Sequence, residues 1–245
     1  MATTLIFGGS GKVARHITRL LSSQGTTVYS IIRKPEQKSD IESLGGKPIV
    51  QSIEDASVED FIKTIKDTSA KVIIWSAGAG GGSAERTKAV DQVGAIKAMD
   101  ATAKAGVKRF IMVSAIDIRD KSKAEPEWYN DDDRARSEKM WGAIGAYCEA
   151  KLAADRELVS RKDLEWTIVR PGGLSEEAST GKVNAGKVHI SPTIPREDVA
   201  KVVIEVIKNE GTVGTIFDVV GGETSISDAI AGVAKEKVDT FAGRY

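Results

Sequence analysis

Short apolar runs alternate along this chain with segments of helical periodicity. The apolar runs are rich in Val and Ile, as is typical of strands buried on both faces of a parallel sheet; they cover residues 3–7, 26–32, 48–51, 71–77, 109–114, 165–170 and 215–220. The helical pattern predicts helices at residues 13–23, 36–44, 58–67, 84–105 and 227–238. Repeated strand and helix units predict an α/β fold, with a doubly wound, mostly parallel sheet of about seven strands and helices on both faces.

Two stretches interrupt this alternation. Residues 116–145 are polar and charged with little periodicity, and residues 173–195 are irregular. In doubly wound sheets the connections after the later strands cover the edge that binds ligands. We therefore predict a single domain, residues 1–245, in which both stretches form walls of a substrate pocket. The alternative is that they are solvated surface insertions without a role.

Composition narrows the classes of partner. The 35 basic residues balance the 35 acidic ones, and no charge block indicates nucleic acid or a membrane surface. No apolar run approaches the length of a membrane span. One cysteine, Cys148, and two separated histidines, His16 and His189, predict neither a disulfide nor a metal site. We expect a cytoplasmic protein that acts on a small-molecule substrate, as a monomer, with a dimer as the alternative.

A glycine cluster joins the first predicted strand to the first predicted helix. Its sequence is Gly8-Gly9-Ser10-Gly11-Lys12-Val13. A bare backbone admits a phosphate, and the free N–H groups at the start of a helix bind it. In this context the cluster predicts the dinucleotide site of a Rossmann fold. The alternative is a tight strand-to-helix turn without a ligand.

Two further strand ends bear on the cofactor. The second strand ends at Arg33 and Lys34, where an acidic residue would favour NAD and basic residues favour the 2′-phosphate of NADP. Lys12 adds a third positive charge. These residues predict a preference for NADPH over NADH, against the alternative of an exposed basic turn. Ala77 and Gly78, after the fourth strand, are small enough for close approach of the cofactor ribose.

Tyr147 and Lys151 are the candidate chemical groups. Their spacing places them on one face of a helix, one turn apart. A neighbouring ammonium stabilises a phenolate, so we expect Lys151 to lower the pKa of Tyr147 towards neutrality. Ser114, at the end of the fifth strand, could hydrogen-bond a substrate carbonyl that Tyr147 protonates. An ordinary amphipathic helix is the alternative explanation of the spacing.

At this point the chain resembles the short-chain dehydrogenase/reductase superfamily, in its atypical branch. The matching segments are residues 8–14, 89–91, 110–115, 147–151, 163–172 and 196–200. The resemblance is closest to small NAD(P)-binding epimerase-like proteins, which are similar to biliverdin-IXβ (flavin) reductases and NmrA-like proteins. The chain departs from the superfamily where an acidic residue usually follows the third strand, since Ser52 and Ile53 occupy that region.

The resemblance implies roles for individual residues. Gly8, Gly11, Lys12 and Arg33 would bind NADP. Pro171 and the backbone after it, from Gly172 and Gly173 to Leu174, would face the nicotinamide. Asp91 would orient Lys151 through water or by direct pairing, the alternative being a helix-face carboxylate without a role.

Three functions remain open on this reading. The first is an NADPH-dependent oxidoreductase that reduces a small carbonyl, quinone or flavin-like compound. The second is a non-catalytic NADP(H)-binding redox sensor or regulator. The third is an epimerase or isomerase that retains its cofactor.

Overall fold

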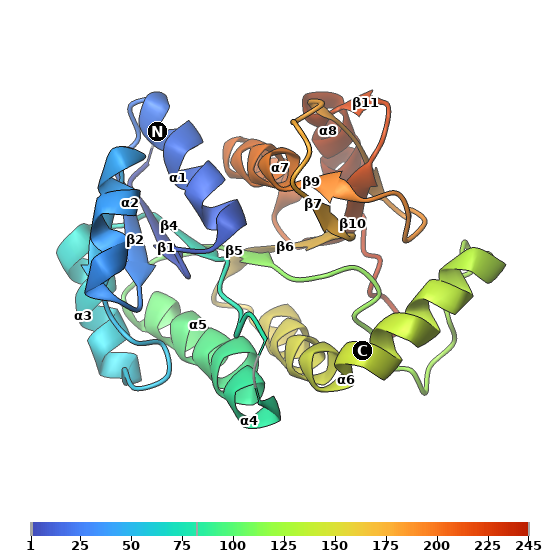
Figure 1. Cartoon of the computed structure of the whole chain (residues 1–245), viewed down its shortest axis with the longest axis horizontal. Helices are drawn as coiled ribbons and strands as arrows, with labels where there is room; N and C mark the ends of the chain where they lie inside the picture. Colours follow the sequence, from blue (N-terminus) through green and yellow to red (C-terminus); the bar gives the residue numbers. More distant parts are fainter. Residues whose placement is uncertain (1, 82, 245) are drawn as a thin grey trace.

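One large sheet runs through the part of the chain that the computed structural model describes, residues 2–81 and 83–244. Its nine strands follow the order β11-β8-β10-β6-β5-β4-β1-β2-β3 (Figure 1). The parallel strands are β1 (Thr4–Phe7), β2 (Val28–Ile32), β3 (Lys47–Val50), β4 (Val72–Trp75), β5 (Arg109–Val113), β6 (Glu165–Pro171) and β10 (Thr215–Gly221). These strands correspond to the seven apolar runs, so the prediction of a doubly wound, mostly parallel sheet is confirmed.

Helices cover both faces of this sheet, as predicted. Figure 1 shows α1 (Lys12–Ser23), α7 (Arg196–Lys208) and α8 (Ile226–Glu236) on one face, and α3 (Val58–Thr68), α5 (Ala95–Lys104) and α6 (Asp131–Ser160) on the other. Shorter helices are η1 (Pro35–Gln37), α2 (Lys38–Ser43) and η3 (Glu210–Thr212). The direction of winding reverses between β1 and β4. In such sheets this reversal opens a crevice where ligands bind.

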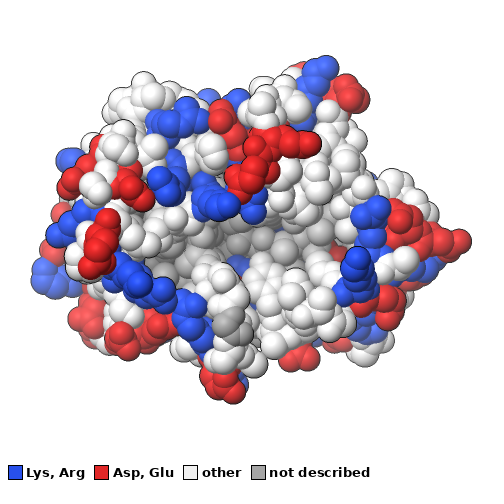
Figure 2. All heavy atoms as spheres, in the orientation of Figure 1, with Lys and Arg blue, Asp and Glu red and all other residues white. Residues whose placement is uncertain are grey.

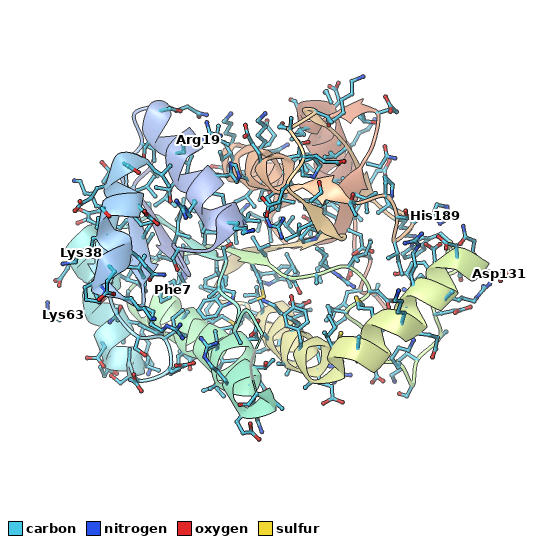
Figure 3. All side chains as sticks on the ribbon, in the orientation of Figure 1. Phe7, Arg19, Lys38, Lys63, Asp131 and His189 are labelled. Atoms are coloured by element: carbon cyan, nitrogen blue, oxygen red, sulfur yellow. The ribbon has the colours of Figure 1, made fainter. Side chains whose placement is uncertain are left out.

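The largest side chains of the core meet between the sheet and α3. Phe7 packs edge-on against Phe61 with 4.9 Å between ring centroids, and lies 5.6 Å from Trp75. Figure 3 shows Phe7 in the interior, whereas Lys38, Lys63 and Asp131 lie at the periphery. Phe7 is the last residue of β1, so this packing fixes the strand end from which the glycine cluster departs.

Short strands that the apolar pattern does not predict lie within and after the second irregular stretch. They are β7 (Leu174–Ser175), β8 (Lys182–Gly186), β9 (Ile194–Pro195) and β11 (Thr224–Ser225). β8 extends the sheet antiparallel to β10, and β11 pairs with β8. Their backbone pairing, and not a continuous apolar run, defines them, which is why the prediction of about seven strands omits them.

The predicted helix at residues 84–105 is interrupted. It consists of α4 (Ala84–Thr87), a π-helical segment η2 (Lys88–Gly94) and α5. A π-helical turn contains an extra residue and therefore rotates the side chains that it carries. Asp91 lies within this segment and its side chain is fully buried.

α6 starts within residues 116–145, so the prediction that this whole stretch is irregular is wrong. The Asn130 side chain accepts a hydrogen bond from the Asp133 backbone at 2.9 Å, and Asp133 accepts one from the Asn130 backbone. The three consecutive aspartates from Asp131 to Asp133 occupy the first turn, where negative charge is favourable. A charged run that reads as a loop is therefore the start of a long helix.

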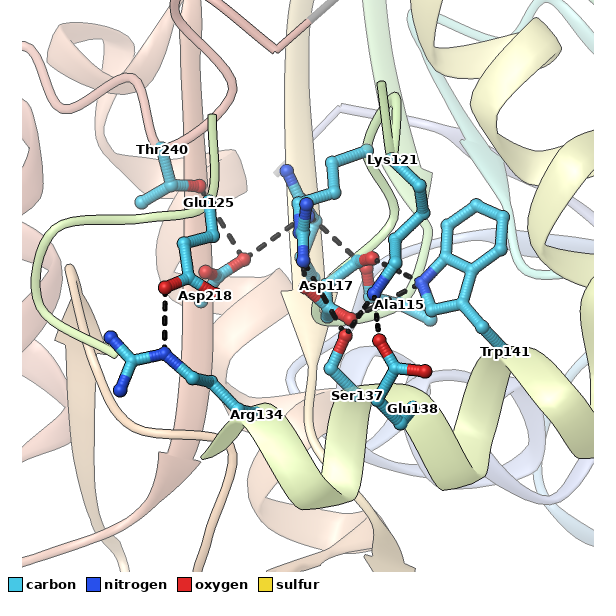
Figure 4. A network of polar contacts seen from close by, with 12 residues as sticks. Ala115, Asp117, Lys121, Glu125, Arg134, Ser137, Glu138, Trp141, Asp218 and Thr240 are labelled. Atoms are coloured by element: carbon cyan, nitrogen blue, oxygen red, sulfur yellow. Dashed lines mark hydrogen bonds and ion pairs between the residues drawn. The ribbon is translucent and has the colours of Figure 1, made fainter. Parts of the chain in front are cut away.

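A buried polar layer holds the preceding segment and α6 against the sheet (Figure 4). Asp117 binds Arg119 at 2.7 Å and accepts a hydrogen bond from the indole of Trp141. Arg170 of β6 and Asp218 of the neighbouring strand β10 form an ion pair of 3.1 Å. These charges are paired with one another, which is the condition for burying them at tolerable cost.

Within the described residues, none of the helices combines the length and apolar character that crossing a bilayer requires.

Two carboxyl groups of this layer titrate abnormally. Burial raises the pKa of Asp155 and of Asp218 to about 6, although Arg170 opposes the shift in both. The folded protein therefore holds these protons more tightly than the unfolded chain, where aspartate titrates near 4. The stability that the two groups contribute is present at low pH and falls as the pH rises from about 4 to about 6.

We predict that Asp218→Asn weakens this dependence, because an amide resembles the protonated acid and does not ionise. Between about pH 5 and pH 7.5, the wild-type protein should lose on the order of 1 kcal/mol more stability than the variant. Urea unfolding at both pH values measures the difference. Asp163→Asn is the control, since Asp163 is 51% exposed. Equal pH slopes in wild type and Asp218→Asn contradict the assignment.

Candidate functional site

The glycine cluster forms a tight turn at the carboxyl end of β1. Gly8 has φ of +80°, and a Cβ there would lie 2.5 Å from the Cα of Ala77. A Cβ on Gly9 would lie 2.5 Å from the Cβ of Ser30. Gly11 is the N-cap of α1, and no side chain of the described residues caps that helix. The turn therefore needs glycine for packing and leaves the first N–H groups of α1 open to an anion.

A pocket of about 210 Å³ opens beside this turn, between the ends of β1, β2 and β4. Of the predicted cofactor residues, those that line it are Gly8, Ser10, Gly11, Arg33, Ile53, Ala77 and Gly78. The guanidinium of Arg33 is not engaged in an ion pair within the described part of the chain. The structure thus brings the glycine turn, the basic strand end and the small residues after β4 around one cavity.

Four other predicted residues lie around this pocket without lining it. Gly9 packs on Ser30, and Val13 is buried within α1. Lys34 is the N-cap of η1, and its backbone N–H donates to the Gln37 side chain at 3.0 Å. Ser52 accepts a hydrogen bond from the backbone of Asp55. These positions shape the turns beside the pocket.

Glu54 and Arg86 also line the pocket, although the sequence does not predict them as site residues. Glu54 follows β3 at two positions beyond Ser52, so an acidic residue is present near the expected place. Its carboxylate binds Arg86 Nε at 2.7 Å, and Arg86 also donates to the Ala79 carbonyl at 2.5 Å. No local pattern links two residues 32 positions apart, so this pair could be found only in the folded chain.

Lys12 points to a different partner from the one expected. Its ammonium binds Glu176 at 2.5 Å, and Glu176 also binds Arg196 at 2.9 Å. Lys12 and Glu176 are both more than 60% exposed. These contacts link the start of α1, the segment after β7 and the start of α7 beside the glycine turn.

Asp91 pairs directly with Lys151, which decides between the two arrangements that the resemblance implies. Lys151 Nζ lies 3.4 Å from Asp91 Oδ1, and both side chains are at most 3% exposed. Asp91 Oδ2 also accepts a hydrogen bond from the Ala79 backbone at 2.9 Å. Lys151 lies 3.4 Å from the carbonyls of Ala77 and Val113. One ion pair therefore joins η2, α6 and the loop after β4.

Tyr147 lies beside this pair on α6, one helical turn before Lys151. Lys151 Nζ is 5.8 Å from the centre of its ring. Burial raises the pKa of Tyr147, and the opposing effect of Lys151 is smaller. The predicted lowering of that pKa is therefore wrong, because desolvation of the phenolate outweighs the nearby ammonium. Tyr147 is a neutral phenol at physiological pH, the form that can donate a proton.

Lys151 keeps its charge in this setting. Burial opposes the charged form of Lys151, but the pKa of Lys151 is raised: Asp91 favours the ammonium, and Tyr147 adds to this effect only as a phenolate. The buried ammonium is thus a permanent positive charge beside the Tyr147 ring.

Ser114 lies on the same face of the sheet as α6, at the end of β5. Its hydroxyl donates a 2.7 Å hydrogen bond to Asp155 Oδ2, and Ser114 is only 5% exposed. Asp155 was not predicted, although it follows Lys151 by one further helical turn. A contact between Ser114 and a substrate carbonyl remains a prediction, and it requires exchange of this internal hydrogen bond.

The segment after β6 is held by backbone hydrogen bonds to β10 and β9. Gly172 donates to the Val219 carbonyl at 2.9 Å, and the Gly173 carbonyl accepts from Ile194 at 2.8 Å. A Cβ on Gly172 would lie 2.9 Å from Val220. Pro171 is buried, whereas Leu174 is 38% exposed. Their contact with a nicotinamide ring remains a prediction.

Comparison with known proteins indicates a family that binds NAD(P)H. The model of a family described as NAD(P)H-binding matches residues 8–210. The UPF0659 protein C216.03 of Schizosaccharomyces pombe is 42% identical over 234 residues, which are 95% of each chain. The uncharacterized sugar epimerase YhfK of Bacillus subtilis is 34% identical over 92% of this chain and 97% of its own.

A solved structure shows the same architecture. The oxidoreductase ylbE of Lactococcus lactis is 27% identical and superposes with a TM-score of 0.77, over 95% of this chain and 97% of that one. The family match at residues 8–210 spans the segments that carry the glycine turn and the Asp91–Lys151 pair. The chain belongs to the NAD(P)H-binding family, an atypical branch of the short-chain dehydrogenase/reductase type.

Proposed function

We propose that this protein is an NADPH-dependent reductase of a small carbonyl, quinone or flavin-like compound. The observation that carries the proposal is the group of Tyr147, Lys151 and Asp91 next to the dinucleotide pocket. The phenol is protonated, the ammonium is charged, and a buried carboxylate holds the ammonium in place. The name of the Lactococcus relative, an oxidoreductase, supports the same class of reaction.

The pocket residues fit the cofactor. The glycine turn leaves room that a Cβ would fill, and the uncapped start of α1 supplies N–H donors for a diphosphate. Arg33 lines the pocket wall, and its guanidinium is our proposed partner for the 2′-phosphate. When bound, NADPH supplies the hydride.

The protein's own contribution is the proton. Tyr147 donates its phenolic proton to the substrate oxygen, which becomes a hydroxyl group. The charged Lys151 stabilises the phenolate that remains, and Asp91 keeps Lys151 in position. A buried phenolate beside a fixed ammonium costs less than one alone, so the barrier to proton donation falls.

Replacement of Tyr147 by Phe tests the proton donor. We predict that Tyr147→Phe lowers turnover by about 10²-fold or more, because a general acid typically contributes that much. NADPH affinity should stay unchanged. Consumption of NADPH with carbonyl, quinone and flavin acceptors measures turnover, and Tyr29→Phe is the control. Unaltered turnover in Tyr147→Phe overturns this mechanism, and tight NADPH binding without turnover in the wild type supports a regulator instead.

Replacement of Arg33 by Ala tests the preference for NADPH. We predict about tenfold weaker NADPH binding, or ~1.4 kcal/mol, and unchanged NADH binding, since only NADPH carries the 2′-phosphate. Calorimetric titration of both cofactors measures the effect. Lys63→Ala is the control, because Lys63 lies on α3 with its side chain 76% exposed and does not line the pocket. Equal loss for both cofactors, or no loss for either, contradicts the role of Arg33.

A second candidate is an epimerase that retains its cofactor, as the name of the Bacillus relative suggests. The contacts of Glu176 with Lys12 and Arg196 favour this candidate. They connect the start of α1 to the start of α7 beside the glycine turn. Such a link would slow cofactor release.

We predict that Glu176→Gln raises the rate of NADPH dissociation several-fold, since a neutral amide holds the two cations more weakly. Stopped-flow displacement of NADPH measures this rate, and Glu177→Gln is the neighbouring control. Epimerase chemistry predicts that the wild-type protein keeps its cofactor through purification and dialysis. Rapid loss of cofactor, unaffected by Glu176→Gln, removes this candidate.

A further inference from the structure

An apolar groove lies beyond the cofactor pocket. One wall is formed by Ala79, Gly80, Gly81, Ala84 and Thr87 and the other by residues 143–147, and the groove has a volume of about 380 Å³. This volume lies within the range of sites for small organic ligands. Figure 2 shows a hollow across the middle of this face, with uncharged (white) atoms over much of its floor and basic side chains (blue) along its borders.

The groove exists because α6 is broken. Ile144 has φ of −133° and ψ of 35°, which are not helical angles, and its side chain is 45% exposed. Gly142 and Gly145 flank the break, and a Cβ on either would meet nothing within 4 Å. Gly145 lines the groove, whereas Gly142 does not. The break therefore sets the shape of one wall.

The groove is continuous with the site of the proposed reaction. Ala79 lines both the cofactor pocket and the groove, and Tyr147 lines the groove. Asp91 holds the backbone of Ala79 and also pairs with Lys151. A molecule in the groove is thus bordered by the cofactor pocket on one side and by the proton donor on the other.

The chemistry of the walls limits what can bind. None of the described residues that line the groove is charged, and Thr87 and Tyr147 provide its side-chain hydroxyls. Two cations lie near these walls and both are already paired: Arg86 binds Glu54 and the Ala79 carbonyl, and Lys151 binds Asp91. A phosphate or carboxylate in the groove would lose hydration without gaining a countercharge. A sugar would leave most of its hydroxyl groups without partners.

We propose that the groove is the acceptor site and that it takes an uncharged, largely apolar carbonyl compound, in preference to carboxylated compounds or nucleotide-linked sugars. This inference rests on the proposed reductase function. In the reaction the carbonyl carbon gains a hydride from NADPH, and the oxygen gains the proton of Tyr147. The carbonyl becomes an alcohol, NADPH becomes NADP⁺, and solvent returns the proton to Tyr147.

The experiment compares two aldehydes that differ in charge. The probes are 6-methoxy-2-naphthaldehyde and 6-carboxy-2-naphthaldehyde. Binding of each to the NADP⁺-loaded protein is measured by calorimetry, and turnover of each with NADPH is measured separately. We expect the uncharged aldehyde to bind at least tenfold more tightly than the carboxylated one.

Gly145→Leu should fill the groove and weaken binding of the uncharged probe at least tenfold, with NADPH affinity unchanged. Gly142→Leu is the matched control, because it adds the same side chain outside the groove and should leave binding unchanged. Ala84→Leu narrows the groove from the opposite wall, so it repeats the test if Gly145→Leu folds poorly. Leucine also has a better helix propensity than glycine.

Each outcome bears on one claim. The groove is supported if the uncharged probe binds more tightly than the carboxylated one and if Gly145→Leu or Ala84→Leu weakens that binding. If the same probe binds in this way but is not turned over, the reductase function alone fails. Turnover that both groove variants leave intact overturns the groove and keeps the reductase function. Absent binding of the uncharged probe, or equal binding of both probes, overturns the inference.

Discussion

A charged lysine in a protein interior has few tolerable arrangements, and the Asp91–Lys151 pair is the one on which this site depends. Both side chains are nearly inaccessible to water, so removal of either partner would strand a buried charge at a cost of several kcal/mol. Asp91 reaches Lys151 from a π-helical turn and also binds the backbone of Ala79. The same contact therefore fixes α6, the loop after β4 and the position of the Tyr147 ring.

The polar layer between α6 and the sheet also fixes the position of α6. Ser114 and Asp155 join β5 to α6, while Arg170 and Asp218 join β6 to β10. The apolar face that a helix usually presents to a sheet is here partly replaced by paired charges. Such a layer is costly to bury and tolerates few geometries, so it specifies where α6 lies more narrowly than hydrophobic packing alone does.

The sequence predicts the parallel strands because each is a nearly continuous apolar run between polar segments. It predicts Gly8, Arg33 and Ala77 at one pocket because carboxyl ends of parallel strands share an edge. The sequence does not predict two elements whose local composition is atypical. Asp131 starts a helix in a segment with the composition of a loop, and β8 is defined by its pairing with β10. The prediction of a lowered pKa for Tyr147 is wrong for a related reason. Residue spacing reveals the neighbouring ammonium of Lys151 but not the burial of Tyr147, which has the larger effect on that pKa.

The break at Ile144 divides α6 into two parts with different anchors. The inner part is held by Lys151 and Asp155 through the core of the molecule. The outer part is held by Asp133, whose carboxylate binds His189 at 2.6 Å and the Ile190 backbone at 2.8 Å. The two sets of anchors lie on opposite sides of the break, and the wall of the groove at residues 143–147 spans it. Substitution of Ala143 or Ile144 can thus alter which compound enters, while Lys151 and Asp155 hold the segment that carries the proton donor.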